Sequence, residues 1–222
     1  GLLELNPKKI PEEIDICLLA VKPQKLGEVL KENKSRINIG TLIISVVAGK
    51  NFHFFHSYLH NEQPIIRVMP NTPVAINQGI SAIVADKFVT QNQMNLAEKL
   101  FYSLGEIVIL ENESEINAVT AISGSGPAYV FNFIENLIES AKELGLSPEV
   151  SKKLTVQTVV GAGILARSSS TSPRKLRENV TSPGGTTHAA LEILMDDKFG
   201  WEKIIRKAAK AAHDRSLELA GK

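Results

Sequence analysis

The run ICLLAV, from Ile16 to Val21, is apolar at every position and stops at Lys22-Pro23. Two further runs, apolar except for Ser45 and Arg67, follow at Leu42 to Val47 and Ile65 to Met69. Strands that are apolar on both faces are typical of a parallel sheet covered by helices. Segments with helical patterning separate the three runs, at residues 24–34 and 52–60. This alternation predicts the later part of a doubly wound, Rossmann-like domain.

The alternation of strands and helices continues to about residue 110, and only helices are expected after it. A strand, a helix and a strand are expected at residues 81–85, 91–104 and 107–110. From Glu113 onward the strand signals stop, and six helical segments are expected at 116–122, 128–144, 149–167, 173–179, 186–195 and 201–219, with Gly124 to Pro127 breaking the first from the second. We therefore expect an α/β Rossmann-like domain over residues 1–112 and an all-α domain over residues 113–222.

Two short stretches carry the chemistry that can be inferred from the sequence: AISGSGPAY, from Ala121 to Tyr129, and NVTSPGGTT, from Asn179 to Thr187. Each combines small residues, a proline and hydroxyls, which lets a backbone approach a small anion and meet it with N–H groups. In the second stretch Gly184 and Gly185 precede an apolar helical pattern, so a helix should begin there with unpaired donors. A loop with a threonine cap is the simpler interpretation of SPGG alone.

The composition excludes several classes of partner. The 222 residues carry 25 Lys and Arg against 24 Asp and Glu, a formal net charge of +1. Such a balance creates no field that would attract nucleic acid or an anionic membrane. No apolar run approaches the ~20 residues that a membrane span needs, and the lone cysteine, Cys17, lies in a strand pattern and reads as a reduced core residue. We expect a cytoplasmic protein with a small-molecule ligand.

The residues also narrow the reaction class. No metal site is expected, because the histidines are scattered and His53, His56 and His60 share a helical face without the glutamate of an HExxH motif. SGSGP is not the GxSxG of a hydrolase elbow. What remains is a site of backbone donors and hydroxyls at the carboxyl edge of a nucleotide-type sheet, which suits hydride transfer to a small carboxylate.

The chain resembles the pyrroline-5-carboxylate reductases, which catalyse the last step of proline biosynthesis. The motifs LLAVKPQ (18–24), SVVAG (45–49), RVMPNTP (67–73), AVTAISGSGPAY (118–129) and VTSPGGTT (180–187) occur in the order and at the approximate spacings of that family. The resemblance implies reduction of 1-pyrroline-5-carboxylate to L-proline by NADPH or NADH. It also implies an interlocked helical homodimer, with dimers assembled into larger rings.

The resemblance further implies roles for single residues. The substrate carboxylate would lie on the N–H groups around Ser182, Gly184, Gly185 and Thr186, and the hydroxyl of Thr187, the candidate catalytic residue, would bind the ring nitrogen. Glu113 would lie near the substrate pocket, although a charge at a helix N-terminus on a solvated surface explains it equally well. The candidate cofactor contacts follow the strand ends, with Asn179 near the nicotinamide: Ala20, Val21, Lys22, Pro23, Ala48, Gly49, Asn71 and Asn179.

One departure from the family concerns the N-terminus. A family member should open with a strand, a GxGxxG-like turn and a helix, but residues 1–15 contain no glycine-rich turn. We expect this sequence to be part of a longer protein, whose first βαβ unit is missing from the 222 residues given. Two alternatives stay open. One is a non-catalytic oligomeric binding module. The other is another two-domain Rossmann reductase, such as a β-hydroxyacid dehydrogenase, although Lys142 lacks the asparagines that should follow a catalytic lysine there.

Overall fold

The computed structural model describes residues 14–220 and divides them into two compact units. The first unit holds residues 14–125 together with 211–220, and the second holds residues 126–210. The contact-based division after Ser125 lies beyond the domain boundary that we expect near Asn112, so residues 113–125 pack with the sheet unit.

The first unit is built on a five-stranded sheet whose strands follow one another in chain order. The strands are β1 Ile16–Leu19, β2 Leu42–Ser45, β3 Ile65–Met69, β4 Gly79–Ala85 and β5 Gly105–Ile109. Strands β1, β2 and β3 are parallel, β4 runs antiparallel to β3, and β5 is parallel to β4. A short connection suffices between β3 and β4 because antiparallel neighbours need no crossover helix. The parallel-dominant sheet confirms the Rossmann-like class.

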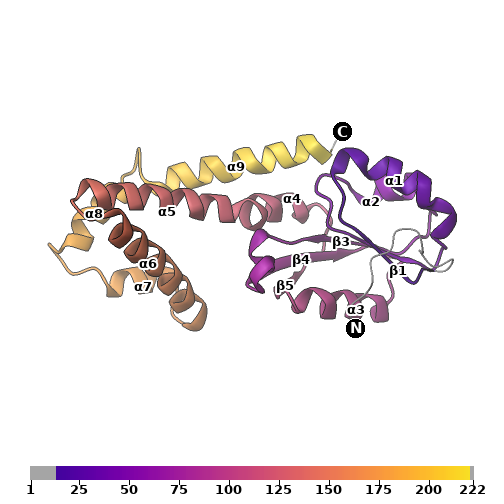
Figure 1. Ribbon diagram of the computed structural model, residues 1–222, viewed down its shortest axis with the longest axis horizontal. Helices are drawn as coiled ribbons and strands as arrows, with labels where there is room; N and C mark the ends of the chain where they lie inside the picture. Colours follow the sequence, from indigo (N-terminus) through magenta and orange to yellow (C-terminus); the bar gives the residue numbers. More distant parts are fainter. Residues whose placement is uncertain (1–13, 221–222) are drawn as a thin grey trace. The chain divides into compact units, whose positions relative to one another are not determined.

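Helices cover both faces of this sheet (Figure 1). The helices α1 Leu26–Asn33 and α2 Phe52–Tyr58 lie on one face, and α3 Gln91–Tyr102 lies on the other. A separate hydrophobic core lies on each face of the sheet, and neighbouring residues of β2 belong to different cores. Ile43 packs with Leu26 and Phe55, whereas Ile44 packs with Phe101. Successive strand side chains point to opposite faces, so a strand with apolar residues on both faces packs against helices on both sides of the sheet.

Short 3₁₀ segments complete the sheet unit. They lie at η1 Pro23–Lys25, η2 Lys34–Arg36 and η3 Thr72–Ile76. The helix predicted over residues 24–34 is therefore divided, with a 3₁₀ turn before α1 and another after it. Proline at the first position of η1 favours this start, since its missing N–H would have no helical partner there.

The break predicted at Gly124 to Pro127 takes a different form in the structure. The helix α4 Glu115–Val119 continues through a wide π-type turn, η4 Thr120–Gly124, and α5 Gly126–Glu143 begins almost at once. The N–H of Ser125 donates to the carbonyl of Thr120 at 2.8 Å, one residue farther back than in an α-helix. Pro127 is tolerated because it lies in the first turn of α5, where its missing N–H costs no helical bond.

The second unit contains helices only. They are α5, α6 Pro148–Ser168, α7 Pro173–Asn179, α8 Thr186–Leu194 and the part of α9 Trp201–Ala220 up to residue 210. The N-termini of α6 and α7 are capped by Ser147 and Ser172, whose hydroxyls accept from Val150 and Lys175. A serine cap followed by a proline is a helix-start signal that can be read in the sequence.

Candidate functional site

The candidate cofactor residues of the first unit gather at one edge of the sheet. Ala20 to Pro23 follow β1, Ala48 and Gly49 follow β2, and Asn71 follows β3. Because these strands are parallel, their carboxyl ends share an edge, which is where ligands bind in open α/β sheets. Lys22 is exposed. The side chain of Asn71 accepts from the N–H of Ile80 at 2.9 Å, so its amide oxygen holds the start of β4.

A pocket of about 470 Å³ lies at this edge within the first unit. Two of the predicted cofactor residues, Pro23 and Ala48, line it. Its other lining residues are not among those predicted from the sequence: Gln24, Gly27, Lys50, Phe54, Tyr58 and Leu219. Lys50 directly follows the predicted pair Ala48-Gly49 and could have been selected from its position. Leu219 carries no such signal, because only the folded chain brings the end of α9 to this pocket.

Gly49 shows why the turn after β2 needs a glycine. Its φ of +71° lies in the left-handed region that other residues rarely adopt. A Cβ at this position would also come within 3.2 Å of the backbone oxygen of Leu219. The turn and the last turn of α9 therefore pack backbone to backbone, and they form one wall of the pocket.

Glu113 lies just before α4 and contacts two elements of the sheet unit. Its Oε1 accepts from the N–H of Phe52 at 2.6 Å and from Nη1 of Arg67 at 2.8 Å. Arg67, on β3, is buried. The substrate contact that we expect from Glu113 stays a prediction, and these two bonds show that one of its oxygens already has a structural task.

Apart from Glu113, which belongs to the first unit, the candidate substrate residues lie together in the second unit, on the loop between α7 and α8 and in the first turn of α8. The N–H of Gly185 donates to the carbonyl of Ser182 at 3.0 Å, and Gly184 has a φ of +69°. Gly185 is the N-cap of α8, without a side-chain cap bond, and Thr186 and Thr187 are the first two helical residues. The first N–H groups of α8 thus lack a side-chain partner, which is the arrangement that receives an anion. Asn179, the last residue of α7, is exposed.

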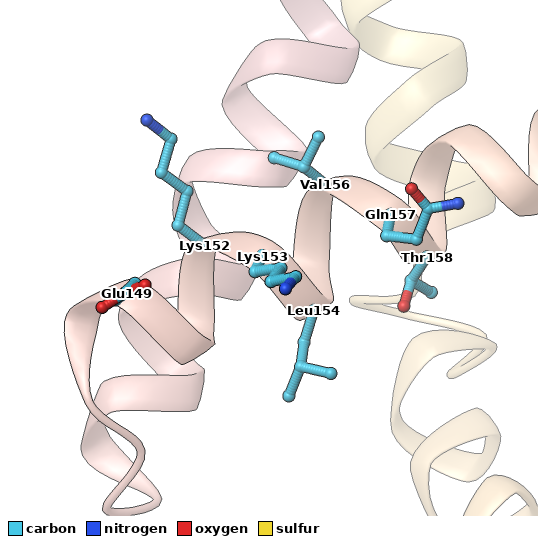
Figure 2. Close-up of a pocket in the computed structure, with 7 residues that line it drawn as sticks. All are labelled: Glu149, Lys152, Lys153, Leu154, Val156, Gln157 and Thr158. Carbon is cyan, nitrogen blue, oxygen red and sulfur yellow. The ribbon is translucent and has the colours of Figure 1, made fainter.

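The helix α6 carries a hollow of about 660 Å³ that contains none of the predicted site residues. Figure 2 shows Val156 and Leu154 leaving opposite sides of the helix. Exposed apolar residues extend both sides along the helix: Val150 and Leu165 lie on the side of Leu154, Val160 lies on the side of Val156, and Ile164 lies between the two. A helix that is apolar on two sides is normally buried on both. This surface is therefore suited to contact with another protein chain.

Other site chemistries find little support within residues 14–220. No group of three or more His, Cys, Asp or Glu is placed to hold a metal ion there. The ring of His56 is engaged by Asp86 at 3.0 Å and by the carbonyl of His60 at 3.1 Å. Burial raises the pKa of the Cys17 thiol. Among the described helices, none is both long and apolar enough to cross a membrane.

Comparison with known proteins gives the same family from three directions. Residues 113–219 match the family model described as pyrroline-5-carboxylate reductase dimerisation. The chain is 37% identical over 219 residues to the pyrroline-5-carboxylate reductase of Pseudomonas aeruginosa, covering 99% of this chain and 79% of that relative. The reductase structure from Coxiella burnetii superposes with a TM-score of 0.87 at 37% identity, covering 93% of this chain and 76% of that one.

A third relative bears on the cofactor. The pyrroline carboxylate reductase of Plasmodium falciparum, solved with NADP bound, has a TM-score of 0.85 and 34% identity, over 93% of this chain and 77% of that one. Both the extent of the matches and their identity are well above what a shared fold alone would give. The chain belongs to the pyrroline-5-carboxylate reductase family.

Proposed function

We propose that this protein reduces 1-pyrroline-5-carboxylate to L-proline by hydride transfer from NADPH or NADH. The observation that carries the proposal is the relationship to pyrroline-5-carboxylate reductases at 37% identity over 99% of the chain. The protein is then an oxidoreductase of proline biosynthesis. The relatives compared above are named as reductases of this imine, which favours this activity over a binding module or a different two-domain reductase.

The residues at the carboxyl edge of the sheet suit a dinucleotide. The pocket of about 470 Å³ between Pro23 and Ala48 is large enough for a flat ring with its ribose. In our proposal Ala20 to Pro23, Ala48, Gly49 and Asn71 border the cofactor, and Asn179 lies against its reactive end. When bound, the dinucleotide supplies the hydride, while the chain binds, orients and shields the reactants.

The loop between α7 and α8 is the proposed substrate site. The N–H groups around Ser182, Gly184, Gly185 and Thr186 hold the carboxylate at the start of α8, where the helix dipole favours negative charge. The hydroxyl of Thr187 binds the ring nitrogen and fixes the imine carbon in position to accept the hydride. Thr187 is half-buried, so its hydroxyl works in a less aqueous environment than an exposed one.

The protein acts as a homo-oligomer, in line with the dimerisation model that residues 113–219 match. We propose the division that the sequence indicates, with residues 1–112 as the cofactor domain and 113–222 as the substrate and dimerisation domain. The apolar residues of α6 support an interlocked dimer, since those on both sides of the helix are exposed in the single chain and a second copy can cover them. Dimers assemble into a ring in this proposal. The net charge of +1 gives no reason to expect nucleic acid or an anionic membrane as a partner.

Replacement of Thr187 tests the proposed chemistry. Loss of a hydrogen bond to a charged or charging group costs about 1.5–3 kcal/mol, so Thr187→Ala should lower kcat roughly ten- to a hundredfold. Thr187→Ser keeps the hydroxyl and should restore most of the rate. Steady-state reduction of the imine, followed by the absorbance of NADPH, measures both. An unaltered kcat in Thr187→Ala would remove this residue from the mechanism.

A further inference from the structure

The carboxylate of Glu113 links three parts of the sheet unit through one oxygen atom. Oε1 accepts from Nη1 of Arg67 on β3 at 2.8 Å and from the N–H of Phe52, the first residue of α2, at 2.6 Å. Glu113 itself lies in the segment between β5 and α4. Sequence separations of 46 and 61 residues make these contacts tertiary, so the carboxylate ties distant elements together.

The environment of this contact makes it strong. The side chain of Arg67 is 8% exposed and that of Glu113 is 27% exposed. A buried guanidinium needs a counter-charge, because an uncompensated charge in the interior is costly. The N–H of Phe52 is one of the first donors of α2, which have no partner within the helix. A carboxylate meets both requirements, because it neutralises Arg67 and accepts from the positive end of α2.

The element that Glu113 fixes is the turn from Ala48 to Asn51. Asn51, the N-cap of α2, accepts from the N–H of Phe54 at 2.9 Å, so it and Glu113 satisfy two different donors of the same helix end. The turn enters α2 through Gly49, whose φ is +71°. Ala48 and Lys50 of this turn line the pocket at the carboxyl edge of the sheet.

We propose that Glu113 is a positioning residue for the cofactor: it holds the Ala48 to Asn51 turn, through Phe52 and Arg67, in the conformation that binds the dinucleotide. This inference rests on the proposed function, in which Ala48 and Gly49 border the cofactor. It gives Glu113 a role distinct from the substrate contact that the sequence suggests. A turn that must be ordered by the ligand weakens binding, whereas a turn held in advance does not.

The test measures cofactor and substrate separately in the intact enzyme. Glu113→Ala removes both bonds, and Glu113→Gln keeps an acceptor oxygen of the same reach but removes the charge. We expect the Kd for NADPH, measured by calorimetry without the imine, to rise about tenfold in Glu113→Ala and less in Glu113→Gln. The KM for pyrroline-5-carboxylate should change by less than about twofold in either variant.

Glu115→Ala is the matched control. Its carboxylate accepts from the N–H groups of Glu111 and Asn112, so it holds its own turn rather than α2 or β3. We expect Glu115→Ala to leave the Kd for NADPH unchanged. If Glu113→Ala lowers the folded yield, Glu113→Gln, which has nearly the same volume, carries the measurement.

The outcomes separate the possible roles of Glu113. A raised KM for the imine with an unchanged Kd for NADPH makes Glu113 a substrate ligand and overturns the proposal. An unchanged Kd with unchanged kinetics overturns it as well. Because NADPH binding is measured without turnover, an enzyme that failed to reduce this imine would refute the proposed function while still giving a result for Glu113.

Discussion

The hydroxyl of Ser216 on α9 donates to the amide oxygen of Asn117 on α4 at 2.8 Å, across 99 residues of sequence. Ser216 is only 7% exposed. This bond belongs to the sheet unit and lies one helical turn from Leu219, which lines the pocket at the sheet edge. The last turns of α9 are therefore fixed against α4 by a specific polar contact.

Removal of that hydroxyl should loosen the end of α9. Ser216→Ala loses one hydrogen bond and leaves the Asn117 oxygen without this donor, so we expect a loss of about 1–2 kcal/mol in the free energy of unfolding. Urea denaturation followed by circular dichroism measures the loss. In Asn117→Ala the bond is already absent, so adding Ser216→Ala should cost less there than in the wild type. Equal costs in both backgrounds would mean that the two side chains are not coupled.

Replacement of either glycine of the substrate loop should impair substrate binding, for a different reason at each position. In Gly184→Ala the new Cβ meets open space, but a φ of +69° strains it by about 1–2 kcal/mol. In Gly185→Ala the backbone is unstrained, and the Cβ would lie 2.5 Å from Oγ and 3.2 Å from the carbonyl oxygen of Ser182. We expect both changes to raise the KM for the imine by about tenfold, because each displaces the N–H groups that hold the carboxylate.

A double variant distinguishes the two causes. Ser182→Ala keeps the backbone N–H and removes Oγ, so it should relieve part of the Gly185→Ala defect and none of the Gly184→Ala defect. Steady-state kinetics of the three single variants and the two double variants give the comparison. Gly185→Ala with a wild-type KM would show that the loop does not hold the carboxylate in the arrangement that we propose.

The sequence predicts most of the fold for reasons that act locally. The mostly apolar runs at Leu42 to Ser45 and Ile65 to Met69 form strands buried at every position, as a pattern apolar on both faces indicates, whereas Ile16 and Leu18 of β1 are exposed. The helix ends at Ser147 and Ser172 carry cap residues followed by proline, so the starts of α6 and α7 could be placed closely. The wide turn at Thr120 to Gly124 could not, because small residues permit both a break and a π-type turn.

The residues of the candidate site likewise include some that local sequence patterns predict and others that only the folded chain brings together. Pro23 and Ala48 could be selected because parallel strands bring their carboxyl ends to one edge. The bonds of Glu113 to Phe52 and Arg67, and the position of Leu219 beside Gly49, depend on segments that meet only in the folded chain. No periodicity or motif in the sequence records such contacts. The family resemblance supplied residue roles at the Ser182 to Thr187 loop that the pattern of small residues alone left open.

Acid should open the turn before α9. The Oδ1 of Asp196 accepts from the N–H groups of Phe199 at 2.7 Å and Lys198 at 2.8 Å, and these donors hold the pKa of Asp196 below its usual range, Phe199 contributing most. Because the pKa is lower in the folded chain, the contribution of Asp196 to stability is present above the unfolded pKa of about 3.9. It is lost as the pH falls through the folded value.

An NMR titration of the Asp196 carboxyl carbon checks this expectation. Its midpoint should lie below that of the same carboxyl in the urea-unfolded chain, and the amide signals of Lys198 and Phe199 should shift with the same midpoint. Asp196→Ala should abolish the shift of those two amides. A folded midpoint at or above the unfolded one would contradict the assigned hydrogen bonds.

A charge on the apolar surface of α6 should separate the subunits. Leu154 is 54% exposed in the single chain and leaves α6 on the side opposite Val156 (Figure 2). Burial of a leucine side chain contributes about 1.5–3 kcal/mol, and a symmetric dimer buries it twice. Leu154→Asp adds the cost of desolvating two carboxylates, so we expect the dimer Kd to rise by at least a hundredfold.

Lys153→Asp, which changes a polar neighbour on the same helix, is the control. Sedimentation velocity on the intact enzyme should show monomer at micromolar concentration for Leu154→Asp and dimer for the control, while a dimer in both would place the subunit interface on another surface.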